Sequence, residues 1–288
     1  MDYVLVNNVV ADNQWQQIKT QASDPKHPNV ISLVSAPKLG KYFGEPGVNG
    51  INVLDRLTHR KYHPGQYRFF NDVPVPYWDK VFVNKDGSIS IYDHGSEIGK
   101  EYLYPNTRRA AQDVRYTNPD GTMDYIEEYA YDGTIFSNLF YAEDEMLEMV
   151  FYDQRHRPVV RYYLYQKVIN LVTVEDPETH EVLKRYDSLD AFYNDQLRSI
   201  VTKDDTVTID YMGVELMALA NTESHNILRL VESPLDDQGQ VRGNLADILT
   251  DRIKKIQTVQ VSAADYKILQ NQDLPLEKVV IIIDNQSM

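Results

Sequence analysis

The sequence has no cysteine in its 288 residues. Disulfide frameworks, thiolate nucleophiles and cysteine-ligated metals are therefore excluded. No stretch approaches the roughly 18 consecutive apolar residues of a membrane-spanning helix, so we expect no integral membrane segment. The first residues, MDYVLVNNVVADN, contain an early Asp2 and no basic region, which is unlike a signal peptide. Together these absences predict a cytoplasmic protein.

Positive charge is also scarce. The chain has 29 lysine and arginine residues against 43 aspartate and glutamate residues, a formal net charge of −14. Binding to phosphate backbones needs clustered lysine and arginine, so we expect no nucleic-acid partner. The patterns G-x-S-x-G, H-E-x-x-H and the Walker motif are missing as well. The sequence therefore does not identify a catalytic centre.

Tyrosine, by contrast, is over-used, with 21 residues. Tyrosine-rich segments alternate with turn signals from about Gln66 onward, and Asp-Gly pairs between apolar runs favour two-residue type I′ hairpins. We predict a large antiparallel β-meander over residues 66–187. Its expected strands are 80–84, 88–93, 97–104, 109–117, 122–131, 134–142, 145–152, 158–165, 168–174 and 181–187.

The two faces of this predicted sheet are similar in character. Neither face is uniformly apolar or uniformly polar. In strand 122–131 one face carries Met123, Tyr125, Tyr129 and Tyr131, and the other carries Asp124, Ile126, Glu128 and Ala130. In strand 145–152 one face carries Leu147, Met149 and Phe151, and the other carries Met146, Glu148, Val150 and Tyr152. A sandwich core would give a cleaner alternation of apolar and polar residues. We therefore expect a single-layer, extended sheet that is partly covered and partly open.

The flanking segments, 1–65 and 188–288, show strand and helix patterns joined by short loops, which indicates a Rossmann-like α/β body carrying the meander as an insertion. Apolar strands such as VVIII suit a parallel sheet covered on both sides. The expected strands are 3–6, 29–34, 206–210, 226–233, 258–263 and a buried 278–284. The expected helices are 12–20 capped by Asp12, 52–62, 189–201 capped by Ser188, one within 239–255, and 264–270, while 214–220 suits a helix or a strand.

Two weaker patterns suggest a phosphate site or a metal site. The glycine-rich segment 40–50 could cradle the phosphate of a sugar nucleotide, although it lacks the G-x-G-x-x-G spacing and suits an ordinary loop. His59 and His63 have the i, i+4 spacing of zinc ligands, but Pro64 ends the helix, which favours a surface or capping role. We accordingly expect no metal site.

Carboxylates are abundant, and their spacing is not selective. Glu215 and Glu223 have the E-x7-E spacing of retaining glycosyltransferases, but the surrounding VELMALANTE lacks a glycine- and proline-rich context, which favours coincidence. The remaining conspicuous acids are expected on a solvated face of the sheet. They are Asp113, Asp124, Glu127 and Glu128.

The tyrosine-rich sheet itself is the best candidate for a working surface. Tyrosines can simply pack on one another, but an open sheet with aromatic faces and free edges can also hold a partner or an extended peptide. The candidate contact residues are Tyr77, Trp78, Tyr125, Tyr129 and Tyr131.

Several stretches resemble one protein family. They are FNDVPVPYW at 70–78, NTRRAAQDVRY at 106–116, the tyrosine-rich Asp-Gly hairpins, and Gly243-Asn244-Leu245 followed by IQTVQVSAADYKIL. Over about 65–284 the chain is similar to GtfB-type glycosyltransferase-stabilising proteins of the accessory Sec systems of Gram-positive bacteria.

This resemblance implies a GT-B-like body with an inserted β-meander. It also implies a non-catalytic chaperone subunit that stabilises a GtfA-type O-GlcNAc transferase and helps to bind a Ser/Thr-rich adhesin polypeptide. The subunit itself would need no cofactor, because UDP-GlcNAc would be bound by the catalytic partner. The complex would be cytoplasmic, with peripheral attachment to the inner face of the membrane left open. Two alternatives remain: a fragment of a catalytic UDP-sugar glycosyltransferase using segment 40–50, and a carbohydrate- or peptide-binding module of the same export pathway.

Overall fold

The computed structural model describes residues 1–9, 11–34, 36–75 and 80–282. They form two compact units. The first consists of 1–33, 47–53 and the chain from Asp190 onward, and the second of 34–46 and 54–189. None of the helices in the described residues is both long and apolar enough to cross a membrane.

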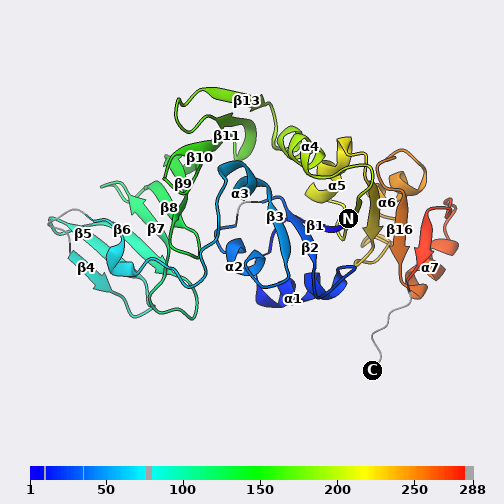
Figure 1. Ribbon diagram of the computed structural model, residues 1–288, viewed down its shortest axis with the longest axis horizontal. Coiled ribbons are helices and arrows are strands. Elements are labelled where there is room, and N and C mark those ends of the chain that lie inside the picture. The colour runs from blue at the N-terminus through cyan, green and yellow to red at the C-terminus, as the bar shows by residue number, and fades with distance from the viewer. Residues whose placement is uncertain (10, 35, 76–79, 283–288) are drawn as a thin grey trace. The chain divides into compact units, whose positions relative to one another are not determined.

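The first unit is built on a seven-stranded parallel sheet with the order β17-β16-β15-β14-β1-β2-β3 (Figure 1). Its strands are β1 (Asp2–Val6), β2 (Asn29–Ser32), β3 (Asn49–Asn52), β14 (Thr206–Ile209), β15 (His225–Arg229), β16 (Thr258–Val261) and β17 (Val279–Ile281). Its helices are α1 (Asp12–Gln21), α4 (Leu189–Ile200), α5 (Val214–Ala218), η2 (Leu219–Asn221), α6 (Gly243–Leu249) and α7 (Ala263–Gln270). The Rossmann-like arrangement expected from the flanking segments is confirmed.

Apolar strands hold this sheet together. Leu5, Ile31, Val207 and Val259 are at most 1% exposed, as expected for strands covered on both faces. Three details differ from expectation. Strand β3 forms inside the glycine-rich segment, Asp12 is the first helical residue of α1 rather than its cap, and β17 is an edge strand whose Val280 is 50% exposed instead of buried.

The second unit is dominated by a ten-stranded antiparallel sheet in which β4 to β13 follow one another in sequence order (Figure 1, cyan to green). The strands are β4 (Lys80–Val83), β5 (Ile89–Asp93), β6 (Ser96–Leu103), β7 (Ala111–Thr117), β8 (Met123–Tyr129), β9 (Ile135–Ala142), β10 (Glu145–Tyr152), β11 (Pro158–Tyr165), β12 (Val168–Glu175) and β13 (Val182–Tyr186). The unit also contains α2 (Leu39–Phe43), η1 (Phe70–Asp72) and most of α3 (Val53–Thr58). The predicted meander is confirmed.

The expected type I′ geometry is wrong for the Asp-Gly hairpins of the meander. In these hairpins only the glycine has positive φ, for example +85° at Gly87 and +89° at Gly121. The preceding aspartate instead accepts hydrogen bonds from the residue after the glycine: Asp120 Oδ1 accepts from the backbone N–H of Thr122 at 3.0 Å and from its hydroxyl at 2.6 Å. Pairs of consecutive positive-φ residues, as in type I′ turns, lie elsewhere, at His94-Gly95, Glu143-Asp144 and Gln166-Lys167.

Candidate functional site

Two regions of the chain are candidates for a binding site: the surface of the meander and the α/β body. Tyr77 and Trp78 lie outside the described residues. Tyr129 is 0% exposed, with its ring 5.0 Å from the Arg68 guanidinium and its hydroxyl donating to Glu127. It packs in a core cluster with Val114 and other buried residues. Tyr129 therefore anchors the sheet, and its expected place on a contact surface is wrong.

Tyr125 is part of an aromatic ladder across three neighbouring strands. Its ring stacks on Tyr116 of β7, with centroids 4.5 Å apart and planes inclined by 22°, and lies 5.9 Å from Phe140 of β9. The three residues are direct cross-strand partners, so they share one face of the sheet. All three are half-buried, so part of the ladder's surface faces solvent.

Tyr131 lines a second aromatic feature in the same unit. Its ring lies 4.9 Å from that of Tyr104, and the Lys41 ammonium lies 5.6 Å from its centroid. Together with Tyr62 and Tyr67 it lines a cavity of about 360 Å³. The partner-binding roles of Tyr125 and Tyr131 stay predictions.

The edge strand β4 exposes three apolar residues in a row. Val81, Phe82 and Val83 are 47%, 55% and 69% exposed. At the opposite edge, Val182 and Leu183 of β13 are also exposed, but Lys184 and Arg185 follow them in the strand. Charged side chains on an edge strand discourage pairing with another chain, and an open apolar edge invites it. Strand β4 carries one charged residue, Lys80, before its three exposed apolar residues. We call residues 80–83 the β4 edge.

The acids of the meander are not uniformly solvated. Asp124 is exposed, as expected. Asp113, however, is 5% exposed and accepts a hydrogen bond from Arg115 Nε at 2.8 Å. Glu128 accepts a hydrogen bond from the Ser137 hydroxyl, and burial raises its pKa. The expectation of a solvated face was therefore wrong for Asp113 and Glu128, because each has a polar partner within the sheet that offsets its burial.

The glycine-rich segment is not a phosphate-binding loop. Gly40 lies in α2 and Gly44 is its C-cap, and a Cβ added at Gly44 would come within 2.5 Å of the Tyr62 ring. Gly47 has φ +86° at a tight turn, and Gly50 belongs to β3. The glycines are thus explained by close packing and backbone geometry.

The two histidines do not form a ligand pair. His59 follows α3 and has φ +53°, so the helix does not carry both residues on one face. His63 instead contacts Asp132, whose Oδ2 accepts the His63 backbone N–H at 3.1 Å. The described residues contain no cluster of three or more His, Asp or Glu residues able to hold a metal ion.

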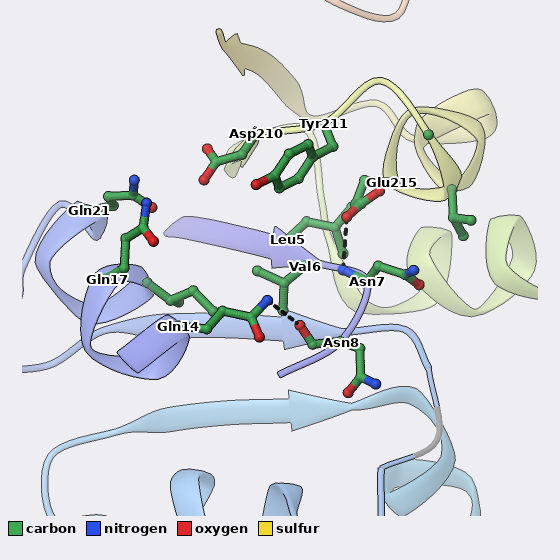
Figure 2. A pocket seen from close by; sticks show the side chains of 13 residues that line it. Leu5, Val6, Asn7, Asn8, Gln14, Gln17, Gln21, Asp210, Tyr211 and Glu215 are labelled. Carbon is green, nitrogen blue, oxygen red and sulfur yellow. Dashed lines mark hydrogen bonds between the residues drawn. The ribbon is translucent and has the colours of Figure 1, made fainter. Parts of the chain in front are cut away.

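The first unit contains a pocket that the sequence patterns did not single out. It opens at the carboxyl ends of β1 and β14, with a volume of about 460 Å³ (Figure 2). The chain continues from β1 to β2 on one side and from β14 to β15 on the other, and such reversals of strand order are where open α/β sheets bind ligands. We call it the switch-point pocket. Its polar lining consists of Asn7, Asn8, Gln14, Gln17, Gln21, Asp210, Tyr211 and Glu215.

Both carboxylates of this pocket are held in place. Glu215, 5% exposed, accepts the Asn7 backbone N–H at 3.0 Å (Figure 2), and burial raises its pKa. Asp210 accepts two hydrogen bonds from Arg229, at 2.6 and 2.8 Å, while burial raises its pKa. Glu223, the other member of the E-x7-E pair, is exposed, which fits coincidence of that spacing.

A local signal for the pocket was present in the sequence. Asn7 and Asn8 directly follow β1, and Gln14, Gln17 and Gln21 recur at the i, i+3, i+7 spacing of one helix face. The buried Trp15 and Ile18 form the apolar face of α1, and the three glutamines lie on the face that lines the pocket.

Comparison of the sequence with protein-family models and with curated proteins gave no match. Solved structures with the same fold were found. A GtfA/B complex bound to UDP and GlcNAc has a TM-score of 0.74 at 16% identity, covering 98% of this chain and 61% of that chain. A glycosylation associate protein complex from Streptococcus agalactiae has 0.72 at 16%, with 98% and 60% covered. TarM has 0.65 at 14%, with 100% and 61% covered.

These likenesses confirm the expected fold, a GT-B-like body with a large inserted β-meander. They extend over nearly the whole chain, and they agree with the resemblance seen in the sequence. The chain spans about three fifths of the length of the solved structures that it matches.

Proposed function

We propose that this chain is the non-catalytic subunit of a protein O-GlcNAc transferase complex, in which it binds and stabilises a GtfA-type glycosyltransferase. Fold similarity to a GtfA/B complex over 98% of the chain supports the proposal. So does the second structural likeness, to a glycosylation associate protein complex, because that protein too is described as part of an assembly.

The observation that carries the proposal is the β4 edge. Monomeric proteins usually blunt their edge strands, because unpaired N–H and C=O groups beside apolar side chains promote pairing with other chains. Here Val81, Phe82 and Val83 remain 47–69% exposed on such a strand. Phe82 packs edge-on against Tyr92 at 5.5 Å, so the exposed ring is already oriented. A partner that buries this strand would remove the apolar surface from water.

The chain would also help to hold the acceptor, a Ser/Thr-rich adhesin polypeptide, in the cytoplasm. The half-buried aromatic ladder of Tyr116, Tyr125 and Phe140 supports this role, since exposed rings on a sheet face suit an extended peptide. UDP-GlcNAc would be bound by the catalytic partner.

Co-expression with a GtfA-type partner tests the assembly. The wild-type chain should co-purify with the partner, and V81K/V83K should not, because two charges would be placed in the buried contact. V280K is the matched control: Val280 is 50% exposed on β17, an edge strand of the first unit, and we expect it to leave the complex intact.

Circular dichroism of the purified variants shows whether each is folded. Two folded wild-type proteins that elute separately would overturn the proposal. Calorimetry with UDP-GlcNAc tests the catalytic alternative: tight binding by this chain alone would favour a glycosyltransferase fragment.

A further inference from the structure

The cavity beside Tyr131 in the second unit combines aromatic rings with a positive charge. Its volume of about 360 Å³ lies within the range of small-molecule sites. Three tyrosines, Tyr62, Tyr67 and Tyr131, line it together with Arg109. The other lining residues are Gly65, Gln66, Thr107 and Ala110. We call this cavity the tyrosine pocket.

Two of the three rings are held in place by their surroundings. Tyr62 packs closely against α2, since a Cβ added at Gly44 would come within 2.5 Å of its ring. Tyr131 donates its backbone N–H to the Pro37 carbonyl at 3.0 Å, and its ring lies 4.9 Å from that of Tyr104. Rings fixed in this way lose little side-chain entropy when a ligand packs against them.

The pocket is accessible from solvent. Tyr67, the third ring, is 46% exposed and lies 4.6 Å from Phe69, which supports it. A Cβ added at Gly65 would meet nothing within 4 Å, so the loop beside Tyr67 leaves open space. A ligand can therefore reach the rings without a change in the backbone.

Arg109 supplies the positive charge of the lining. Its backbone is fixed, because its carbonyl accepts the Phe70 N–H at 2.9 Å and Ala110 forms a bridge with Phe69. Its side chain is exposed and forms no ion pair or hydrogen bond within the described residues. No aspartate or glutamate from the described part of the chain lines the pocket. The guanidinium is therefore available to an anionic ligand.

The surroundings of the pocket also disfavour a cation. Asp132, which follows Tyr131, is 5% exposed and accepts hydrogen bonds from the His63 backbone at 3.1 Å and from the Thr134 hydroxyl at 2.8 Å. The Lys41 ammonium, 5.6 Å from the Tyr131 centroid, adds a second positive charge nearby. Tyrosine rings by themselves attract cations, but these two positive charges repel them.

We propose that the tyrosine pocket binds a small aromatic carboxylate. The ring of the ligand lies against the tyrosine rings in the offset or edge-on arrangement that aromatic pairs prefer. Its carboxylate pairs with the Arg109 guanidinium. The pocket contains no residue of the β4 edge, so this inference does not depend on assembly with a glycosyltransferase.

Saturation-transfer NMR titrations of the full chain test the proposal with probes that share one ring and differ in charge. They are 4-hydroxyphenylacetate, its uncharged amide, and the cationic amine tyramine. We expect the carboxylate to bind about fivefold more tightly than the amide, the contribution of one exposed ion pair. Tyramine should bind more weakly than the amide, because its charge has the same sign as that of Arg109.

Variants assign the two parts of the site. R109Q should weaken binding of the carboxylate about fivefold and leave binding of the amide unchanged, because it removes only the charge partner. Y67A should weaken binding of both, because it removes a ring contact. R108Q is the matched control: Arg108 is exposed and adjacent in the chain but does not line the pocket, so this variant should bind as the wild type does. Circular dichroism shows whether each variant is folded.

Equal affinity for the carboxylate and its amide would overturn the proposal, as would absence of transfer to the carboxylate. An equal loss of affinity in R109Q and R108Q would also overturn it, since the effect would then come from net charge alone. Preferential binding of tyramine would overturn it in favour of a cation site. V81K/V83K, which changes the β4 edge, should leave all these readouts unaffected, so failure of the proposed assembly is distinguishable from failure of this inference.

Discussion

Glu101 makes the stability of this protein depend on pH in an unusual direction. The side chain lies in β6 between Ile89 of β5 and Val114 of β7, its direct cross-strand partners, and is 1% exposed. Its Oε1 has no hydrogen-bond partner within the described part of the chain. Burial, with a further contribution from the charge of Asp113, raises the pKa of Glu101 to about 8.

The sign and size of this pH dependence of the free energy of unfolding follow from proton linkage. Between the unfolded pKa of 4.5 and the folded pKa of about 8, the folded state holds one proton more than the unfolded state. The free energy of unfolding therefore falls as pH rises, by about 1.4 kcal/mol per pH unit. From pH 5.5 to 7.5 this single residue should cost the folded state about 3 kcal/mol. Glutamine in its place cannot ionise, so E101Q should lose this dependence.

Urea unfolding at pH 5.5 and 7.5, followed by circular dichroism, measures the effect as a difference between variants, so that other titrating groups cancel. D124N is the control: Asp124 is an exposed carboxylate of the same sheet, and its removal should leave the wild-type slope unchanged. If wild type and E101Q lose equal stability between the two pH values, Glu101 is not a buried, protonated acid and the reasoning is refuted.

Two further substitutions probe the packing beneath the meander. G44A should lower the free energy of unfolding by about 1–3 kcal/mol, because its Cβ would come within 2.5 Å of the Tyr62 ring. G243A is the control and should not lower it, because a Cβ there meets nothing within 4 Å. Equal thermal midpoints for the two variants would contradict this reasoning. R60M should cost about 3 kcal/mol in urea unfolding, because Arg60 donates to the Ile135 carbonyl at 2.6 Å and lies 5.2 Å from the Phe136 centroid. R56M removes an exposed arginine from the adjoining α3 and should cost much less; equal losses would mean that the Arg60 contacts contribute nothing.

The meander could be predicted from sequence because its determinants are local. Each hairpin joins strands that are adjacent in the chain, and the turn residues lie between them. The predicted type I′ turn was wrong, because that prediction depended on the Asp-Gly pair alone. In the structure the following Ser88, Thr122 or Thr134 donates to the aspartate and stabilises a turn in which only glycine has positive φ.

The switch-point pocket could not be predicted in the same way, because its two walls are far apart in sequence. Asn7 and Glu215, joined by a 3.0 Å hydrogen bond, are 208 positions apart. Nothing local indicates that β1 pairs with β14 rather than with another apolar strand. The pairing brings Val4 opposite Thr208 and only then places the two loops at one edge of the sheet. The burial of Asp113 and Glu128 could not be predicted for a related reason. The alternation of residues along a strand does not show which face of the sheet other parts of the chain cover.

The switch-point pocket and the β4 edge belong to different units, and this separation makes them independently testable. The switch-point pocket is built from residues of the first unit only, and the β4 edge from residues of the second. Strands β1 and β14 pair directly although the whole meander lies between them in sequence, so the meander is an insertion that leaves the order of the parallel sheet intact. Lysines at the β4 edge should therefore abolish partner binding without changing the stability of the first unit, as measured by amide hydrogen exchange. If V81K/V83K also lowers the protection of the first unit, the two units are energetically coupled.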